Sequence, residues 1–147
     1  MADDEAKFFS LREAERLRAQ LEPILIEAIE SRRKLGDLQE KLGQLAERIQ
    51  RAGGMMVSYE DAAKLRIEHN TVEESIREAL ERIQSTGCIV KDLEVGLLDF
   101  PARIEGEEVY LCWKLGEDRI RFYHRQDEGF AGRKPIDPRD PGHNLIQ

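Results

Sequence analysis

The sequence predicts an α+β protein in which a long, coiled-coil-like antiparallel helical hairpin precedes a small antiparallel β-sheet. Apolar residues recur at helical spacing through about residue 87, and they follow the alternating spacing of strands from there to about residue 124. Turn sequences that contain glycine separate the segments. We therefore divide the 147-residue chain into a helical hairpin at 1–87, a sheet region packed on the helices at 88–135, and an irregular tail at 136–147.

The first helix is expected to begin after Ser10, which forms the S-x-x-E pattern of a capping box with Glu13. A heptad pattern then continues to residue 49 without a slip, and such a seam packs against another helix. Pro23 lies within the run, so we expect either a kink there or a break into two helices at Glu22. The two rows of the heptad are Ala14, Leu21, Ala28, Leu35, Leu42 and Ile49, and Leu17, Ile24, Ser31, Leu38 and Leu45.

The second helix is expected after the glycine pair at 53–54, because glycine adopts positive φ without steric cost. Ser58 is the predicted N-cap, Thr71 offers an alternative start, and Gly87 ends the helix. Two helices joined by a short loop run antiparallel and bury little by themselves. A hairpin this long therefore predicts self-association, as a homodimer. The second seam is Ala62, Leu65, His69, Val72, Ile76, Ala79 and Ile83.

Stretches at 88–104, 107–113 and 119–124 are rich in β-branched and aromatic residues, which predicts strands. Glu105-Gly106 and Gly116-Glu117 each fit a two-residue hairpin loop, and such loops fix the register of the strands that they join. The first loop places Ile104 opposite Glu107 and Leu98 opposite Trp113. The second loop places Trp113 opposite Ile120, Leu111 opposite Phe122 and Val109 opposite His124. Pro101 is expected at an edge or at a bend.

This register predicts that Asp99, Cys112 and Arg121 lie side by side on the face away from the helices. We interpret Asp99 and Arg121 as a solvated salt bridge, or alternatively as a platform for an anion or small ligand. Cys112 would act as a nucleophile only beside a base, and the register puts His124 on the opposite face. The predicted core face carries Leu98, Phe100, Ala102, Ile104, Val109, Leu111, Trp113, Ile120, Phe122 and His124.

The segment YHRQDEGFAGRKP, residues 123–135, gathers polar and glycine residues in a short space. In a structural interpretation, Phe130 plugs the end of the sheet and the flanking glycines permit the turn. In a functional one, exposed backbone N–H groups near Gly129 and the side chain of Arg133 form an anion pocket. A second functional interpretation is a divalent metal site. Its ligands would be His124, Asp127, Glu128 and Glu117, with Asp99 as a further oxygen donor.

Composition excludes several classes of protein. Charged residues make up 36% of the chain and the net charge is −7, with no basic cluster, which disfavours nucleic acid as a partner. The N-terminus MADDEAKFF lacks the apolar stretch of a secretory signal, and no apolar run is long enough to span a membrane. Cys88 and Cys112 lack metal-site spacing, so we expect reduced thiols in a cytoplasmic protein.

The motifs DFPA, LCWKLGE, the histidine of FYH, and GFAGR carry a resemblance to a known family. The C-terminal half resembles a bacterial and archaeal domain of unknown function, number twenty-two-oh-three, and FFSLREAERL resembles its start more loosely. Tyr123 stands where that family usually has tryptophan. The resemblance implies no activity, but it implies one characteristic set of residues: Asp99, Phe100, Trp113, Glu117, His124, Gly129, Phe130 and Arg133.

The leading functional prediction is a cytoplasmic binding or scaffolding protein that assembles through its helices. Its sheet end would hold a small anionic ligand or a partner peptide through Arg133 and Arg121, together with Asp99, Gly129, Phe130 and Trp113. The alternative is a metal-dependent hydrolase or related enzyme that uses the carboxylates around His124. A third hypothesis, an adaptor for RNA or the translation machinery, is disfavoured by the charge. Whether the protein catalyses any reaction stays open.

Overall fold

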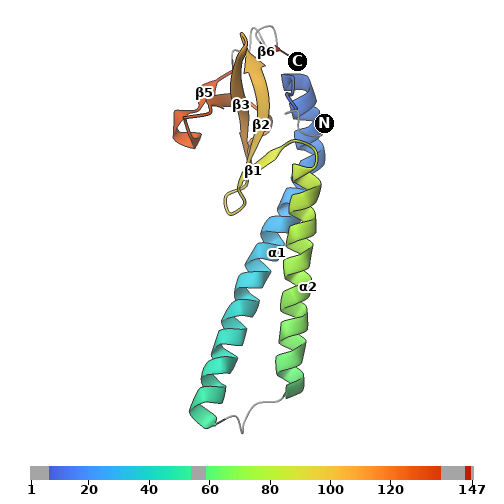
Figure 1. Ribbon diagram of the computed structural model, residues 1–147, viewed down its shortest axis with the longest axis vertical. Coiled ribbons are helices and arrows are strands. Elements are labelled where there is room, and N and C mark those ends of the chain that lie inside the picture. The colour runs from blue at the N-terminus through green and yellow to red at the C-terminus, as the bar shows by residue number, and fades with distance from the viewer. Residues whose placement is uncertain (1–6, 54–58, 137–144, 147) are drawn as a thin grey trace, which may run out of the picture.

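The computed structural model describes residues 7–53, 59–136 and 145–146. It contains two packed antiparallel helices, α1 (Leu11–Ala52) and α2 (Tyr59–Gln84), followed by an antiparallel sheet (Figure 1). The sheet lies beside one end of the helical hairpin, and the other end extends away from it (Figure 1). The predicted fold class is therefore confirmed. Within these ranges, neither helix is long and apolar enough to cross a membrane.

The ends of α1 follow from local sequence. The predicted capping box is present, because the Glu13 N–H donates to Ser10 Oγ at 3.1 Å and the Ser10 N–H donates to Glu13 Oε1 at 3.0 Å. The helix is continuous across Pro23, so the predicted break at Glu22 is absent. It ends at Gly53, whose φ of 63° is left-handed.

The second helix is also continuous. The alternative start at Thr71 is not used, because the Thr71 hydroxyl donates to the Ile67 carbonyl within the helix at 2.8 Å. The predicted N-cap at Ser58 lies outside the described residues. Both helices are therefore unbroken over the residues that the structure describes, and they pack against each other.

The sheet has the order β1-β2-β3-β4-β5, with all pairs antiparallel, and β6 also pairs with β2. The stretch 88–104, predicted as a strand segment, divides into two strands joined by a turn. In the region expected to be an irregular tail, Leu145 pairs with Ile104. The elements are β1 (Ile89–Asp92), β2 (Leu97–Ile104), β3 (Glu107–Lys114), β4 (Phe122–Arg125), the 3-10 turn η2 (Phe130–Gly132), β5 (Lys134–Pro135) and β6 (Leu145–Ile146).

The register predicted for the β2–β3 hairpin is confirmed, with Ile104 opposite Glu107 and Leu98 opposite Trp113. Glu105 and the glycine after it both have positive φ, 52° and 83°, as a type I′ turn requires. The expected bend at Pro101 does not shift the register. Among the described residues, Pro101 has no strand partner on the β1 side of β2, and its carbonyl accepts instead from the Phe9 N–H at 2.7 Å.

The register predicted for the β3–β4 hairpin is wrong by one residue. Val109 lies opposite Arg125, and His124 lies opposite Tyr110. The connection is longer than a two-residue loop because side chains hold it open with hydrogen bonds. Within the loop, the Trp113 indole N–H donates to the Glu117 carbonyl at 3.0 Å, and the Ile120 N–H donates to Glu15 Oε1 of α1 at 2.8 Å.

A shift of one residue moves every side chain of a strand to the other face. Phe122 and His124 therefore lie on the face that carries Asp99 and Cys112, and not on the helix face as predicted. Tyr123, between them on the strand, points the other way and packs against the core.

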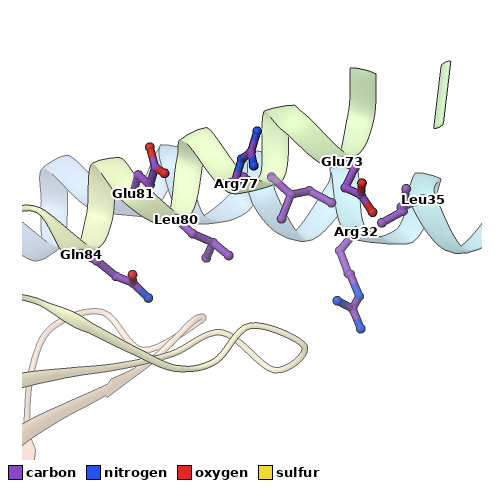
Figure 2. A pocket seen from close by; sticks show the side chains of 8 residues that line it. Arg32, Leu35, Glu73, Arg77, Leu80, Glu81 and Gln84 are labelled. Carbon is purple, nitrogen blue, oxygen red and sulfur yellow. The ribbon is translucent and has the colours of Figure 1, made fainter. Parts of the chain in front are cut away.

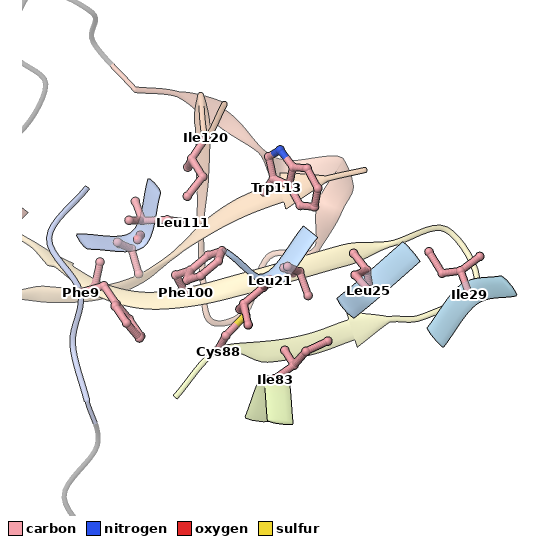
Figure 3. Close-up of a cluster of buried hydrophobic side chains, with 14 residues drawn as sticks. Phe9, Leu21, Leu25, Ile29, Ile83, Cys88, Phe100, Leu111, Trp113 and Ile120 are labelled. Atoms are coloured by element: carbon pink, nitrogen blue, oxygen red, sulfur yellow. The ribbon is translucent and has the colours of Figure 1, made fainter. Parts of the chain in front are cut away.

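The main core lies between the helix face of the sheet and the sheet-proximal half of the hairpin (Figure 3). Trp113 and Phe100 have no exposed surface there, and Phe9 packs edge-on against Phe100 with ring centres 5.7 Å apart. The buried members are Phe9, Ala14, Leu21, Leu25, Ile29, Ile83, Cys88, Leu98, Phe100, Ala102, Val109, Leu111, Trp113 and Ile120.

Candidate functional site

Three adjacent strands place one polar residue each at the same point on the outer sheet face. Asp99 comes from β2, Cys112 lies directly opposite it on β3, and His124 comes from β4. All three are buried, with exposed fractions of 3% or less. One ligand-type atom of each, a carboxylate oxygen, Sγ and a ring nitrogen, lies within 4.8 Å of the other two. The observed register between β3 and β4 brings His124 into this cluster.

The hydrogen bonds of His124 fix the orientation of its ring. Nδ1 lies 2.9 Å from the backbone carbonyl oxygen of Arg125, which can only accept, so Nδ1 carries a proton. Nε2 lies 3.1 Å from Oδ2 of Asp99. One further proton is therefore shared between Nε2 and the carboxylate, either as an imidazolium–carboxylate pair or as a neutral pair.

The environment of Cys112 suppresses its thiolate. Burial raises the pKa of this thiol to about 12, and the negative charge of Asp99 contributes to the same shift. A thiol is a weak nucleophile, and the Nε2 nitrogen that would act as its base is bonded to Asp99. The arrangement of these three residues is therefore unlike that of a nucleophilic cysteine, even though the histidine is on the same face.

A second group of residues lies at the end of the sheet, around Arg133. Its guanidinium makes a two-pronged ion pair with Glu117, at 2.6 Å from Nη2 to Oε2 and 3.4 Å from Nη1 to Oε1. The same group lies 3.9 Å from the ring centre of Phe122 and 4.4 Å from that of Phe130. The side chain is 11% exposed. Arg133 is therefore stacked and charge-balanced within the protein.

The loop before β5 is held by a further ion pair. Lys134 Nζ lies 2.7 and 2.8 Å from the two carboxylate oxygens of Glu128, and these contacts lower the pKa of Glu128. A Cβ at Gly132 would lie 2.8 Å from Cβ of Glu128, so the close packing here requires glycine. The second glycine of the GFAG motif thus has a structural role.

The structure brings the predicted site residues together in two sets and leaves others apart. Asp99 and His124 meet, while Trp113, Glu117, Phe130 and Arg133 are linked at the sheet end. Gly129 is the N-cap of η2. Arg121 is exposed and pairs with Asp118, so it does not lie beside Asp99 as predicted.

The four predicted metal ligands are dispersed. Glu117 pairs with Arg133, Glu128 pairs with Lys134, and Asp127 is exposed on the loop. Sequence reasoning placed Cys112 beside Asp99, as the structure does, but it missed His124 as the third member of the cluster, because the register assumed for the second loop turned His124 away. A longer loop between β3 and β4, in place of the two-residue turn, would have put His124 on the face of Cys112.

The helical hairpin contains a second, smaller core beyond the reach of the main one. Leu35 and Leu38 of α1 and Val72 and Ile76 of α2 are buried there. A groove of about 460 Å³ lies beside it, between the two helices, and is lined by residues that include Arg32, Leu80 and Gln84 (Figure 2). Its lining combines apolar side chains, such as Leu80, with charged ones, such as Arg32.

Comparison with known families gives a match over most of the chain. A family model described as an uncharacterized conserved protein (DUF2203) matches residues 7–136. The chain belongs to this family. The match includes α1, α2, strands β1 to β5 and both residue groups of the sheet, and it ends before β6. Comparisons with curated proteins and with solved structures find no match.

Proposed function

We propose that this chain is a cytoplasmic binding or scaffolding protein that dimerises through the outer half of its hairpin, residues 33–52 and 59–77. The observation that carries the proposal is the rising exposure of the apolar seam of α1 toward the loop. Leu38 is 3% exposed, Leu42 and Leu45 are half-buried, and Ile49 is 40% exposed. Apolar side chains at heptad spacing gain stability when another helix covers them.

The charges of the outer half favour a second copy of the same chain as the partner. Residues 33–52 contain five basic and three acidic side chains, whereas residues 59–77 contain three basic and five acidic ones. In a two-fold symmetric dimer, α1 of one copy lies against α2 of the other, so that opposite charges meet. Lys34 and Glu68 already form such a contact within one chain, at 3.3 Å.

A dimer of this kind is a four-helix bundle, which buries seams that a two-helix hairpin leaves open. The main core covers only the half of the hairpin that lies beside the sheet, and the small cluster around Leu38 is the last buried layer toward the loop. The second copy would continue that layer over Leu45, Ile49 and Leu65. Two free, buried cysteines, Cys88 and Cys112, suit a reducing compartment.

The binding part of the proposal concerns the sheet end. Phe130 is 44% exposed, and the ammonium group of Lys114 lies 5.7 Å from its ring centre. An exposed aromatic ring beside a cation suits a partner peptide or a small anionic ligand. The guanidinium of Arg133 stacks on the ring of Phe130 and holds it in place. The charge of Arg133 is already balanced by Glu117, so we assign Arg133 a supporting role.

Sedimentation equilibrium of the full-length protein tests the dimer. We expect a concentration-dependent dimer that weakens with added salt, since opposite charges contribute to it. Ile49→Glu places a charge in the proposed interface and should weaken the dimer at least about tenfold in Kd, equivalent to ~1.4 kcal/mol.

Ile26→Glu is the matched control, because Ile26 is similarly exposed, at 37%, but lies in the sheet-proximal half of α1. It should leave the dimer unchanged. A wild-type protein that remains monomeric at millimolar concentration, or an equal loss of dimer in both variants, would contradict the proposed assembly.

A further inference from the structure

The cluster of Asp99, Cys112 and His124 has the composition of a transition-metal site. We propose that these three residues bind one divalent metal ion of the zinc type, and that the ion joins β2, β3 and β4. Thiolate, imidazole and carboxylate are the three protein ligands that Zn²⁺ takes, at about 2.0–2.3 Å each. Two atoms bound to one ion at those distances lie at most about 4.6 Å apart. Ligand atoms that are already within 4.8 Å of one another therefore need only small side-chain movements to reach a single ion.

The ring of His124 is oriented as in a metal-ligating histidine. Such histidines donate one ring N–H to a carbonyl or carboxylate and ligate through the other nitrogen. Here Nδ1–H donates to the Arg125 carbonyl at 2.9 Å. Nε2, which ligates once the proton that it shares with Asp99 has left, faces Asp99 at 3.1 Å and therefore points into the cluster.

Asp99 gives a second, independent indication. Its Oδ1 atom is buried and has no hydrogen-bond partner, while its Oδ2 atom faces His124. A buried carboxylate oxygen without a partner costs free energy, and coordination of a cation satisfies it. The hydrogen bond to His124 involves only Oδ2, so it does not account for the burial of Oδ1 without a partner.

The mixed donor set selects the class of ion. Mg²⁺ and Ca²⁺ take oxygen ligands, so the sulfur of Cys112 and the nitrogen of His124 disfavour both. Zn²⁺ and Co²⁺ accept sulfur, nitrogen and oxygen together. On binding, Cys112 releases its thiol proton and the His124–Asp99 pair releases the proton that it shares, both to solvent, so that a thiolate, a neutral imidazole and a carboxylate hold the ion.

The position of the ligands predicts what the ion does. Each of the three comes from a different strand of one sheet. The register between β3 and β4 is weakly specified by local sequence, because a long loop joins the two strands. An ion bound to all three fixes β4 against β2 and β3. Binding should therefore raise the melting temperature, whether or not the protein dimerises.

Cobalt titration of the full-length protein, after removal of metal with a chelator, tests the site. We expect one equivalent of Co²⁺ to bind with a sulfur-to-cobalt charge-transfer absorption, and one equivalent of Zn²⁺ to displace it. Cys112→Ser should abolish the charge-transfer band. Cys88→Ser is the matched control, since Cys88 is equally buried but lies in the apolar core on the other face, and it should keep the band.

Asp99→Asn provides a second variant that keeps the shape of the side chain. It should retain the cobalt–sulfur band but weaken Co²⁺ binding at least tenfold, and it should remove most of the rise in melting temperature. Folded wild-type protein that shows no charge-transfer band with Co²⁺ would overturn the proposal, as would a band that survives in Cys112→Ser. Neither result depends on the oligomeric state.

Discussion

Nε2 of His124 lies 3.1 Å from Oδ2 of Asp99, and each side chain is only 4% exposed. The two residues are 25 positions apart and lie on strands that are not neighbours, with β3 between them. Contact between them requires β4 to be in the observed register. The Asp99–His124 contact therefore forms only when β4 has this register, and it is also part of the candidate site.

A double-mutant cycle on the metal-free protein should show strong coupling between these residues. His124→Ala leaves the Asp99 carboxylate buried without its partner, and loss of one member of a buried pair costs about 3–5 kcal/mol. The double variant Asp99→Ala/His124→Ala should cost less than the sum of the single changes, by roughly 1–3 kcal/mol. Urea unfolding gives the four free energies.

The exposed pair of Glu47 and Arg51 serves as the control cycle, because its side chains are 62% and 76% exposed. Its coupling should be at most about 0.5 kcal/mol. Additive changes at Asp99 and His124 would show that their contact does not contribute to stability.

Replacing the guanidinium of Arg133 should lower the stability of the protein even when the positive charge is kept. Arg133→Lys keeps the positive charge but loses both the two-pronged contact with Glu117 and the stacking between two phenylalanine rings. We expect a loss of about 1–2 kcal/mol in the free energy of unfolding. Thermal or urea unfolding measures it.

Arg121→Lys is the matched comparison, because Arg121 also pairs with an acidic side chain, Asp118, but is 48% exposed. This change should leave the free energy of unfolding nearly unchanged, because exposed ion pairs contribute little. Equal losses of unfolding free energy in the Arg121 and Arg133 variants would mean that stacking on the two phenylalanine rings does not contribute to stability.

The sequence predicts the elements that depend on local rules. The heptads indicate α1 and α2, the S-x-x-E pattern gives the start of α1 at Ser10, and Glu105-Gly106 sets the β2–β3 register residue by residue. In each case neighbours along the chain supply the decisive interactions, so the printed sequence contains the necessary information.

The β3–β4 connection could not be predicted in this way. Gly116-Glu117 fits a short turn, but Glu117 is held by Trp113 and Arg133, and Ile120 is held by a carboxylate of α1. Arg133 and the α1 carboxylate are distant in sequence from the loop residues that they hold, and these contacts override the local preference. The position of His124, and with it the candidate metal site, followed from that one difference.

The capping box at the start of α1 should contribute measurably to stability. Ser10→Ala removes the oxygen that accepts from the Glu13 N–H, and loss of an N-cap costs about 1 kcal/mol. Ser31→Ala, in the middle of the same helix, should be neutral or stabilising by up to about 0.5 kcal/mol, because alanine is the better helix former. If both variants unfold at the same urea concentration, the cap is without energetic effect.

The stability of the metal-free protein should fall at alkaline pH through its buried thiols, Cys88 above all. Burial, with a smaller contribution from the negative charge of Asp99, raises the pKa of the Cys88 thiol in the folded state. In the unfolded chain a thiol loses its proton near pH 8.5. Above that pH the unfolded state binds fewer protons than the folded state, so the free energy of unfolding decreases as pH rises, and below it the contribution is fully present.

The expected slope is about 1.4 kcal/mol per pH unit for each thiol that stays protonated in the folded state. Urea unfolding at a series of pH values from 7 to 10 measures it, with Cys88→Ala as the comparison. The variant starts from a lower stability because a buried side chain is truncated, but its decline above pH 8.5 should be shallower by up to that amount. Parallel declines in the two proteins would show that Cys88 ionises as readily in the folded state as in the unfolded chain.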